Sequence, residues 1–178
     1  MITNIPHIKH LASARAEENW RFRCRLLASP IPREQISSLI FRLYKRASER
    51  IPCTTCGNCC RRVSPLFDAR DIAHMAKAAG LSDARFEDRF LKLDDAHPGI
   101  MVLKKLPCAF LKNSRCSRYR SRPFDCRAYP HIRRHGNTRR MTTLFSNIGI
   151  CPIVFNVWEG LKKDFGARVA GIDEYDWV

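Results

Sequence analysis

Apolar residues recur every three or four positions in two segments near the start of the chain, which is the spacing of one face of an α-helix. The first segment runs from about Leu11 to Leu27 and is irregular. The second follows a break at residues 29–32, where two prolines interrupt the pattern. Its apolar stripe consists of Ile36, Leu39, Ile40, Leu43 and Tyr44. We therefore predict that residues 1–50 form a helical N-terminal extension.

Two capped helices are predicted in the middle of the chain. Asp68 is placed to accept a hydrogen bond at the start of a helix from about Ala69 to Ala79, and Gly80 is typical of the residue that ends one. Ser82 is a capping residue for the next helix. The buried face of this second helix is predicted to consist of three apolar residues at helical spacing: Phe86, Phe90 and Leu93.

Residues that favour β-strands occupy 99–106 and recur in 139–145, so two or three short strands are predicted. A C-terminal helix is predicted to open at Pro152 and to end near Gly166. The inner face of this helix consists of Ile153, Val154, Val157, Trp158 and Leu161. Together these elements predict an α+β fold, a small and mostly helical single domain with a few short strands.

The chain has 178 residues, of which 45% are hydrophobic, and this is enough for one domain with a real core. Nine cysteines are too few for a disulfide-stapled secreted domain, and their odd number also favours a reducing compartment. The N-terminal residues lack the apolar region of a signal peptide, and no later run approaches the length of a membrane span. We therefore expect a cytoplasmic protein without a transmembrane segment.

The formal net charge is +15, which permits nucleic acid, an acidic protein or an anionic substrate as the partner. The basic residues are spread along the whole chain, and no repeated pattern interleaves them with aromatic residues. A surface that is basic only for solubility explains the charge equally well. Charge alone therefore leaves the partner as an unidentified protein or nucleic acid.

Four of the eight residues from position 53 to position 60 are cysteines, and we call them the first cysteine group: Cys53, Cys56, Cys59 and Cys60. The first three have C-x2-C-x2-C spacing, which lets a tight turn bring successive sulfurs onto one ion. Gly57 supplies the positive φ that such a turn needs. Cysteines that serve only packing are normally scattered singly among apolar residues, so this density favours metal ligation over a disulfide or a structural role.

Four later cysteines form the second cysteine group: Cys108, Cys116, Cys126 and Cys151. Eight thiols suit two tetrahedral ions, one binuclear site, or one iron–sulfur cluster with four further cysteines. Cys59 and Cys60 are adjacent and their side chains diverge, so we expect them to serve different metals or one of them to be a non-ligand. The spacings of the later thiols are too long for local chelation, so we expect both groups to meet at one zinc or iron centre.

Three stretches of the chain resemble the CxxCxxCC zinc- or iron-chelating domain family, also called the YkgJ-like cysteine cluster proteins. They are Cys53-x2-Cys56-Gly57-x-Cys59-Cys60, Pro107-Cys108-x-Phe110-Leu111, and Cys116-x2-Tyr119-x2-Arg122-Pro123-x2-Cys126-Arg127-x-Tyr129-Pro130-His131. The resemblance covers roughly residues 51–152 and implies a metal-binding protein. A larger relative, the flagellin lysine-N-methylase, is similar through the same motif. We accordingly expect a cysteine-cluster metal-binding domain over residues 51–165, followed by a C-terminal tail over 166–178.

Several residues near the cysteines have roles that the spacing suggests. Arg122 and Arg127 are placed to offset the negative charge of a thiolate-rich centre and to donate hydrogen bonds to sulfur. Tyr129 is expected to form a wall beside the site. His131 and His135 have the H-x3-H spacing of zinc ligands, but eight thiols already satisfy the coordination of two ions, so we favour thiol ligation.

Three functions remain open at this point. The first is a metal-binding domain whose zinc or iron centre holds the fold. The second is an enzyme, either an iron–sulfur oxidoreductase or a protein-modifying enzyme like the lysine methylase. The third is a zinc-stabilised RNA-binding module, which the charge supports although no recognition motif is present. The sequence has no glycine-rich nucleotide loop and no H-E-x-x-H motif, so any catalysis would depend on the metal.

Overall fold

The computed structural model describes residues 1–95, 97–133 and 137–173. These residues form two compact units, and we call them the helical unit, residues 1–52 with 130–178, and the cysteine unit, residues 53–129. The cysteine unit is thus inserted in the sequence between the two segments of the helical unit. The predicted α+β class is confirmed, because the described residues are mostly helical and contain two sheets of two strands each.

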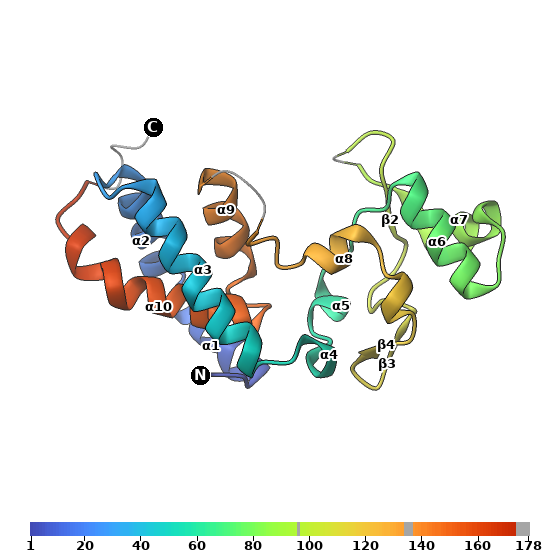
Figure 1. The fold of residues 1–178 in the computed structure, drawn as a ribbon, viewed down its shortest axis with the longest axis horizontal. Helices are drawn as coiled ribbons and strands as arrows, with labels where there is room; N and C mark the ends of the chain where they lie inside the picture. Colours follow the sequence, from blue (N-terminus) through green and yellow to red (C-terminus); the bar gives the residue numbers. More distant parts are fainter. Residues whose placement is uncertain (96, 134–136, 174–178) are drawn as a thin grey trace. The chain divides into compact units, whose positions relative to one another are not determined.

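Five helices make up the described part of the helical unit (Figure 1): α1 (Ile5–Ala14), α2 (Ala16–Ala28), α3 (Arg33–Arg50), α9 (Asn137–Asn147) and α10 (Pro152–Val169). Helix α10 is the central element, since it packs against each of the other four. The side chains of Trp158 and Leu161 are 0% exposed there. Segments from both ends of the sequence therefore share one apolar core.

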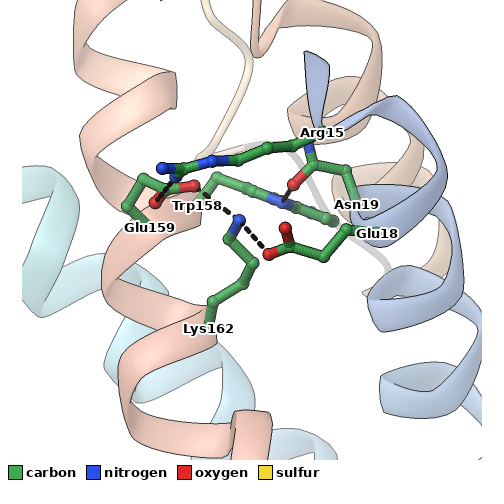
Figure 2. A network of polar contacts seen from close by, with 6 residues as sticks. All are labelled: Arg15, Glu18, Asn19, Trp158, Glu159 and Lys162. Carbon is green, nitrogen blue, oxygen red and sulfur yellow. Dashed lines mark hydrogen bonds and ion pairs between the residues drawn. The ribbon is translucent and has the colours of Figure 1, made fainter. Parts of the chain in front are cut away.

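A set of polar contacts joins α2 to α10 inside this unit (Figure 2). The indole N–H of Trp158 donates to the side-chain oxygen of Asn19 at 2.9 Å, and both residues are buried. The ammonium group of Lys162 lies 2.7 Å from a carboxylate oxygen of Glu18 and 2.8 Å from one of Glu159. Because the buried N–H has a partner, the tryptophan contributes its apolar area without leaving an unsatisfied donor.

The predictions for this unit were right for two helices and wrong for one strand. Helices α3 and α10 begin and end close to the predicted positions, whereas the segment predicted as one helix over 11–27 is two helices that meet at Arg15. Residues 139–145 belong to α9 and not to a strand. Met141 and Leu144 are buried at a three-residue step, and the Phe145 ring packs on Trp158 with centroids 6.0 Å apart.

The cysteine unit consists of short elements: α4 (Cys53–Cys56), α5 (Cys59–Arg62), α6 (Ala69–Ala79), α7 (Asp83–Phe90), β1 (Leu91–Leu93), β2 (Met101–Leu103), β3 (Leu111–Lys112), β4 (Arg115–Cys116), the 3-10 turn η1 (Tyr119–Ser121) and α8 (Phe124–Ala128). Strands β1 and β2 pair antiparallel, with Leu91 opposite Leu103. Strands β3 and β4 form a hairpin in which Leu111 is opposite Cys116.

Local capping explains the two longer helices of this unit. The Asp68 side chain accepts a hydrogen bond from the Asp71 backbone N–H at 2.8 Å, and Gly80 ends α6 with a φ of +72°. Ser82 caps α7 in the same way. The predicted bounds of α6 are therefore confirmed. The prediction that Leu93 lies on the buried face of α7 was wrong, because α7 ends at Phe90 and Leu93 is 64% exposed in β1.

Aromatic side chains from different elements form the apolar core of the cysteine unit. Phe86 of α7 packs on Phe67, Phe90 and Phe110, with ring centroids 6.3, 5.1 and 5.9 Å away. Phe110 leads directly into the β3–β4 hairpin, and Met75 of α6 is buried in the same cluster. This core consequently holds the hairpin and the helices in fixed positions around the cysteines.

No single helix among the described residues is long and apolar enough to cross a membrane. Within the described part of the chain, one pair of helices together has the length and composition of a membrane span, Arg140–Asn147 with Pro152–Val169, but the pair is bent by 114°.

Candidate metal centre

The first cysteine group lies on two short helical turns separated by Gly57. The glycine has a φ of +59°, as the spacing predicted. A Cβ atom at this position would lie 2.8 Å from the Ser114 carbonyl oxygen and 3.0 Å from a methyl carbon of Leu111. Only glycine therefore lets the turn between Cys56 and Cys59 pack directly against the β3–β4 hairpin.

Hydrogen bonds fasten the first cysteine group to the second. The Cys108 backbone N–H donates to the Cys60 carbonyl oxygen at 2.8 Å. The Arg61 guanidinium donates to the Ser114 hydroxyl at 2.9 Å and to the Cys56 carbonyl oxygen at 3.3 Å. The contacts from Cys108 to Cys60 and from Arg61 to Ser114 join residues about fifty positions apart in the sequence, so they hold the turn of the first cysteine group against the segment that carries the second. The contact from Arg61 to Cys56 is local.

Helix α8, which carries Cys126, is held by two carboxylates. Asp71 of α6 is 5% exposed and accepts the Phe124 backbone N–H at 2.8 Å, at the first residue of α8. The Asp125 side chain accepts the Leu66 backbone N–H at 3.2 Å. Both carboxylates accept backbone N–H groups, and together the two contacts fix the position of α8 and so of Cys126.

Six cysteines line one cavity of about 90 Å³ within the cysteine unit, and we call this cavity the thiol pocket. These six are Cys53, Cys59, Cys60, Cys108, Cys116 and Cys126. Cys53 is exposed and the other five are half-buried. The remaining wall is largely apolar and includes Phe67, Phe110 and, as predicted from the sequence, Tyr129. The structure thus brings three cysteines of each group to a single place.

The thiols of the first group share hydrogen bonds. Cys59 donates to its neighbours, and this hydrogen bond is the main cause that lowers the pKa of Cys53 to about 6 and that of Cys60 to about 7. The same interactions raise the pKa of Cys59 far above its usual range. At neutral pH the turn therefore presents two thiols that lose their protons easily. The resulting thiolate is the form of cysteine that binds metal.

In the second group, the pKa values of the thiols that line the pocket are raised. Burial is the largest cause of the raised pKa of Cys108, Cys116 and Cys126, and it brings that of Cys126 to about 12. The negative charge of the Cys60 thiolate raises all three further. Thiols that repel one another as anions around one cavity are stabilised together when a cation neutralises them.

Arg122 is the positive group that faces these thiols. Its guanidinium carbon lies 3.6 Å from the centroid of the Tyr119 ring, and its charge lowers the pKa of both Cys53 and Cys116. The Arg122 Nε atom is buried and has no hydrogen-bond partner among the described residues. A buried N–H donor beside a cluster of thiols is suited to a negatively charged sulfur centre. Arg127, also predicted to offset charge, is exposed and lies over the Phe124 ring.

Three cysteines lie elsewhere. Cys56 is half-buried at the end of α4 and is not among the residues that line the thiol pocket. Cys151 is buried in the helical unit, directly before α10, and so is Cys24 of α2. Ligation by Cys56 and Cys151 stays a prediction. His131 also belongs to the helical unit, and His135 lies outside the described residues.

The donor set fits a thiophilic ion such as zinc or iron, because thiolates are the preferred ligands of structural zinc and of iron–sulfur centres. Within the part of the chain that the structure describes, no three His, Cys, Asp or Glu side chains are already arranged to hold one ion. A metal that binds here displaces thiol protons, including the proton of Cys59 that takes part in hydrogen bonds with Cys53 and Cys60. The residues therefore fit a metal that completes the site as it binds.

Sequence comparison identifies the family of the chain. The family model described as "CxxCxxCC: Putative zinc- or iron-chelating domain" matches residues 52–147. The chain belongs to this family. The matched region contains all six cysteines of the thiol pocket, and it covers more than half of the 178 residues. The comparisons with curated proteins and with solved structures gave no match.

Sequence reasoning missed two supporting residues of the site. Asp71 looks in the sequence like an ordinary acidic residue in the first turn of a helix. Its contact with α8 joins residues more than fifty positions apart, which the sequence does not reveal. Ser114 follows Asn113 in the hairpin turn, where both residues have positive φ. The Asn-Ser pair between two strands is a turn signal, but it does not reveal that the Ser114 carbonyl oxygen would meet Gly57.

Proposed function

We propose that the thiol pocket binds zinc or iron through cysteine thiolates, and that this centre is both the structural core and the functional site of the cysteine unit. The observation that carries the proposal is the convergence of six thiols from two distant sequence groups on one cavity. Packing alone does not explain this arrangement, because cysteines that serve only packing are normally scattered singly, whereas six of them line this one cavity. Metal binding in general agrees with the family to which the chain belongs.

Six thiols exceed the four that one tetrahedral zinc ion or one iron–sulfur cluster needs. A cavity of about 90 Å³ is also larger than a single ion requires, since roughly 10–15 Å³ of such space holds one water molecule. Both observations support a centre with more than one metal atom, either two ions that share thiolates or an iron–sulfur cluster. Arg122 would then stabilise the negative charge of the loaded centre through its buried Nε–H.

The protein is proposed to work in the cytoplasm, where thiols stay reduced. No disulfide joins the cysteines that the structure describes, and the thiolate form needed for metal binding persists only in a reducing compartment.

Metal analysis of the protein purified without oxygen tests the proposal. Iron, zinc and acid-labile sulfide are measured for the parent and for three single variants. Cys60→Ser and Cys116→Ser each remove one thiol of the pocket, one from each sequence group, and we expect both to lose most of the bound metal. Cys24→Ser removes a buried thiol of the helical unit and is expected to keep the parental metal content. A parent without metal, or pocket variants with parental content, would contradict the proposal.

A redox or protein-modifying enzyme is the second candidate. It is supported by the apolar side of the thiol pocket, where Phe67, Tyr119 and Tyr129 form a wall next to the cysteines. Small-molecule sites are commonly apolar cavities with a few polar groups at one end. If sulfide accompanies iron in the purified protein, titration with a reductant distinguishes the two candidates. A centre that changes its visible spectrum reversibly supports redox chemistry, and a zinc-only centre excludes an iron–sulfur oxidoreductase.

A further inference from the structure

The charge of the cysteine unit is concentrated on the segment around the β3–β4 hairpin. No aspartate or glutamate occurs between Asp95 and Asp125, although seven lysines and arginines do. Five of them fall within the eleven residues from Lys112 to Arg122. We use the name hairpin surface for the four that are exposed: Lys112, Arg115, Arg118 and Arg120.

These four side chains are available for an external partner. Those of Lys112, Arg115 and Arg120 make no hydrogen bond or ion pair with any other described residue. The Arg118 guanidinium donates to the preceding Ser117 carbonyl oxygen at 3.3 Å, and its charge acts on the Cys116 thiol. The two carboxylates of neighbouring elements are already engaged by backbone N–H groups, as described for Asp71 and Asp125. Among the described residues, no aspartate or glutamate forms an ion pair with the hairpin surface.

An exposed aromatic ring lies within the same segment. Tyr119 is 43% exposed, although large aromatic side chains are usually buried in a folded domain. The Arg122 guanidinium stacks on the Tyr119 ring at 3.6 Å and holds it in place. An ordered, exposed ring among cations is the arrangement on which the bases of a single strand stack while lysine and arginine contact its phosphates.

We propose that the hairpin surface binds single-stranded nucleic acid, with the four basic side chains on the phosphates and Tyr119 stacked on a base. The burial of the apolar residues of this segment argues against a lipid surface as the partner. A helix or hairpin that lies on a bilayer needs a free apolar face, whereas Leu111 is half-buried against the first cysteine group and Phe110 is buried in the core. The inference is independent of the identity of the metal.

Fluorescence anisotropy with labelled oligo(dT) and oligo(U) of about 12 nucleotides tests the proposal on the metal-loaded full chain, since single-strand sites span about 4–16 nucleotides. Four phosphate contacts on a single strand predict a salt slope of about −2.8, so binding should weaken about 50-fold between roughly 50 and 200 mM salt. Anionic lipid vesicles and an acidic peptide are measured alongside.

Matched charge variants locate the binding surface. The double variant Lys112→Ser/Arg120→Ser removes two cations, neither of which is next to a cysteine, and should weaken binding about 25-fold at roughly 0.1 M salt and halve the salt slope. The control Lys77→Ser/Arg85→Ser removes the same charge from exposed positions of α6 and α7. It should leave both quantities close to those of the parent.

The stacking role has its own variant. Tyr119→Leu should weaken binding by about 5- to 150-fold while leaving the salt slope unchanged, because stacking releases no counterions. Metal content and circular dichroism are recorded for every variant, so that a folded, loaded protein without nucleic-acid affinity counts against this inference alone and not against the metal centre. Equal losses in the two double variants, or binding to vesicles or the acidic peptide without binding to oligonucleotides, would overturn the proposal.

Discussion

Replacement of Gly57 by alanine tests whether the first cysteine group must pack directly on the hairpin. Gly57 has a φ of +59°, and a left-handed conformation costs a residue with a Cβ roughly 1–2 kcal/mol. The added methyl group would also lie 2.8 Å from the Ser114 carbonyl oxygen, which belongs to the backbone and cannot rotate away. Overpacking of this kind costs about 1–3 kcal/mol. The variant should therefore lose about 2–5 kcal/mol of stability in the cysteine unit.

Gly80 provides the matched control for this substitution. It has a φ of +72°, close to that of Gly57, but an added Cβ would meet no atom within 4 Å. Gly80→Ala should therefore cost only the conformational part, about 1–2 kcal/mol. The difference between the two variants isolates the close approach between the turn and the hairpin.

Hydrogen exchange measured by mass spectrometry is the appropriate assay for the metal-free variants. The described tryptophans, Trp20 and Trp158, lie in the helical unit, so tryptophan fluorescence does not report on the cysteine unit. Peptides from residues 53–129 should exchange faster in Gly57→Ala than in Gly80→Ala, and metal affinity should fall by about 5- to 150-fold, because 1.4 kcal/mol corresponds to a factor of ten. Equal exchange and equal affinity in the two variants would refute the proposed packing.

Three further predictions concern the support of the site. Asp71→Ala leaves the Phe124 N–H without its acceptor and should cost about 1–3 kcal/mol in the denaturant-induced unfolding of the metal-free protein, whereas unchanged stability would show that the contact is dispensable. Arg122→Gln should lower metal affinity by about 10- to 100-fold in competition with a chelator, and an unchanged affinity would mean that its buried Nε–H does not support the centre. Metal affinity should decrease from about pH 8 to pH 6, because ligands such as Cys126, whose pKa is raised to about 12, must release protons on binding; a pH-independent affinity would argue against thiolate ligation.

Features determined by neighbouring residues could be predicted from the sequence. The bounds of α6 follow from Asp68 and Gly80, which act within one turn of the helix they limit. The positive φ of Gly57 follows in the same way from the spacing of the cysteines around it. Local hydrogen bonds and backbone conformation depend on few residues, so tertiary packing seldom overrides them.

Features determined by packing could not be predicted. Residues 139–145 include Thr142 and Thr143, which favour strands, yet the segment is helical because Met141 and Leu144 must reach the same core. Leu93 has helical spacing from Phe86, but the helix ends at Phe90 and the chain continues into a strand that pairs with β2. In each case a partner far away in the sequence decides the conformation.

The same distinction applies to the site. The spacing of the first cysteine group indicates metal binding, but it does not show which later thiols lie beside it. That depends on long-range contacts, such as the bond from Cys108 to the Cys60 carbonyl oxygen and the anchoring of α8 by Asp71. Thiols of the same sequence group can thus differ in placement: Cys126 lines the pocket and Cys151 belongs to the helical unit.

The two units differ in how their cores are built, and this difference explains why the cysteines gather in one of them. The helical unit buries long helices around α10, with Trp158 at the centre, so apolar area is sufficient to stabilise it. The cysteine unit has 77 residues, short elements and a small aromatic cluster around Phe86. A single hydrophobic core in a domain of this size rarely supplies more than about 3–5 kcal/mol. Structural metal contributes on the order of 10 kcal/mol to small zinc-binding peptides, so the proposed thiolate centre would supply the stability that the small core lacks.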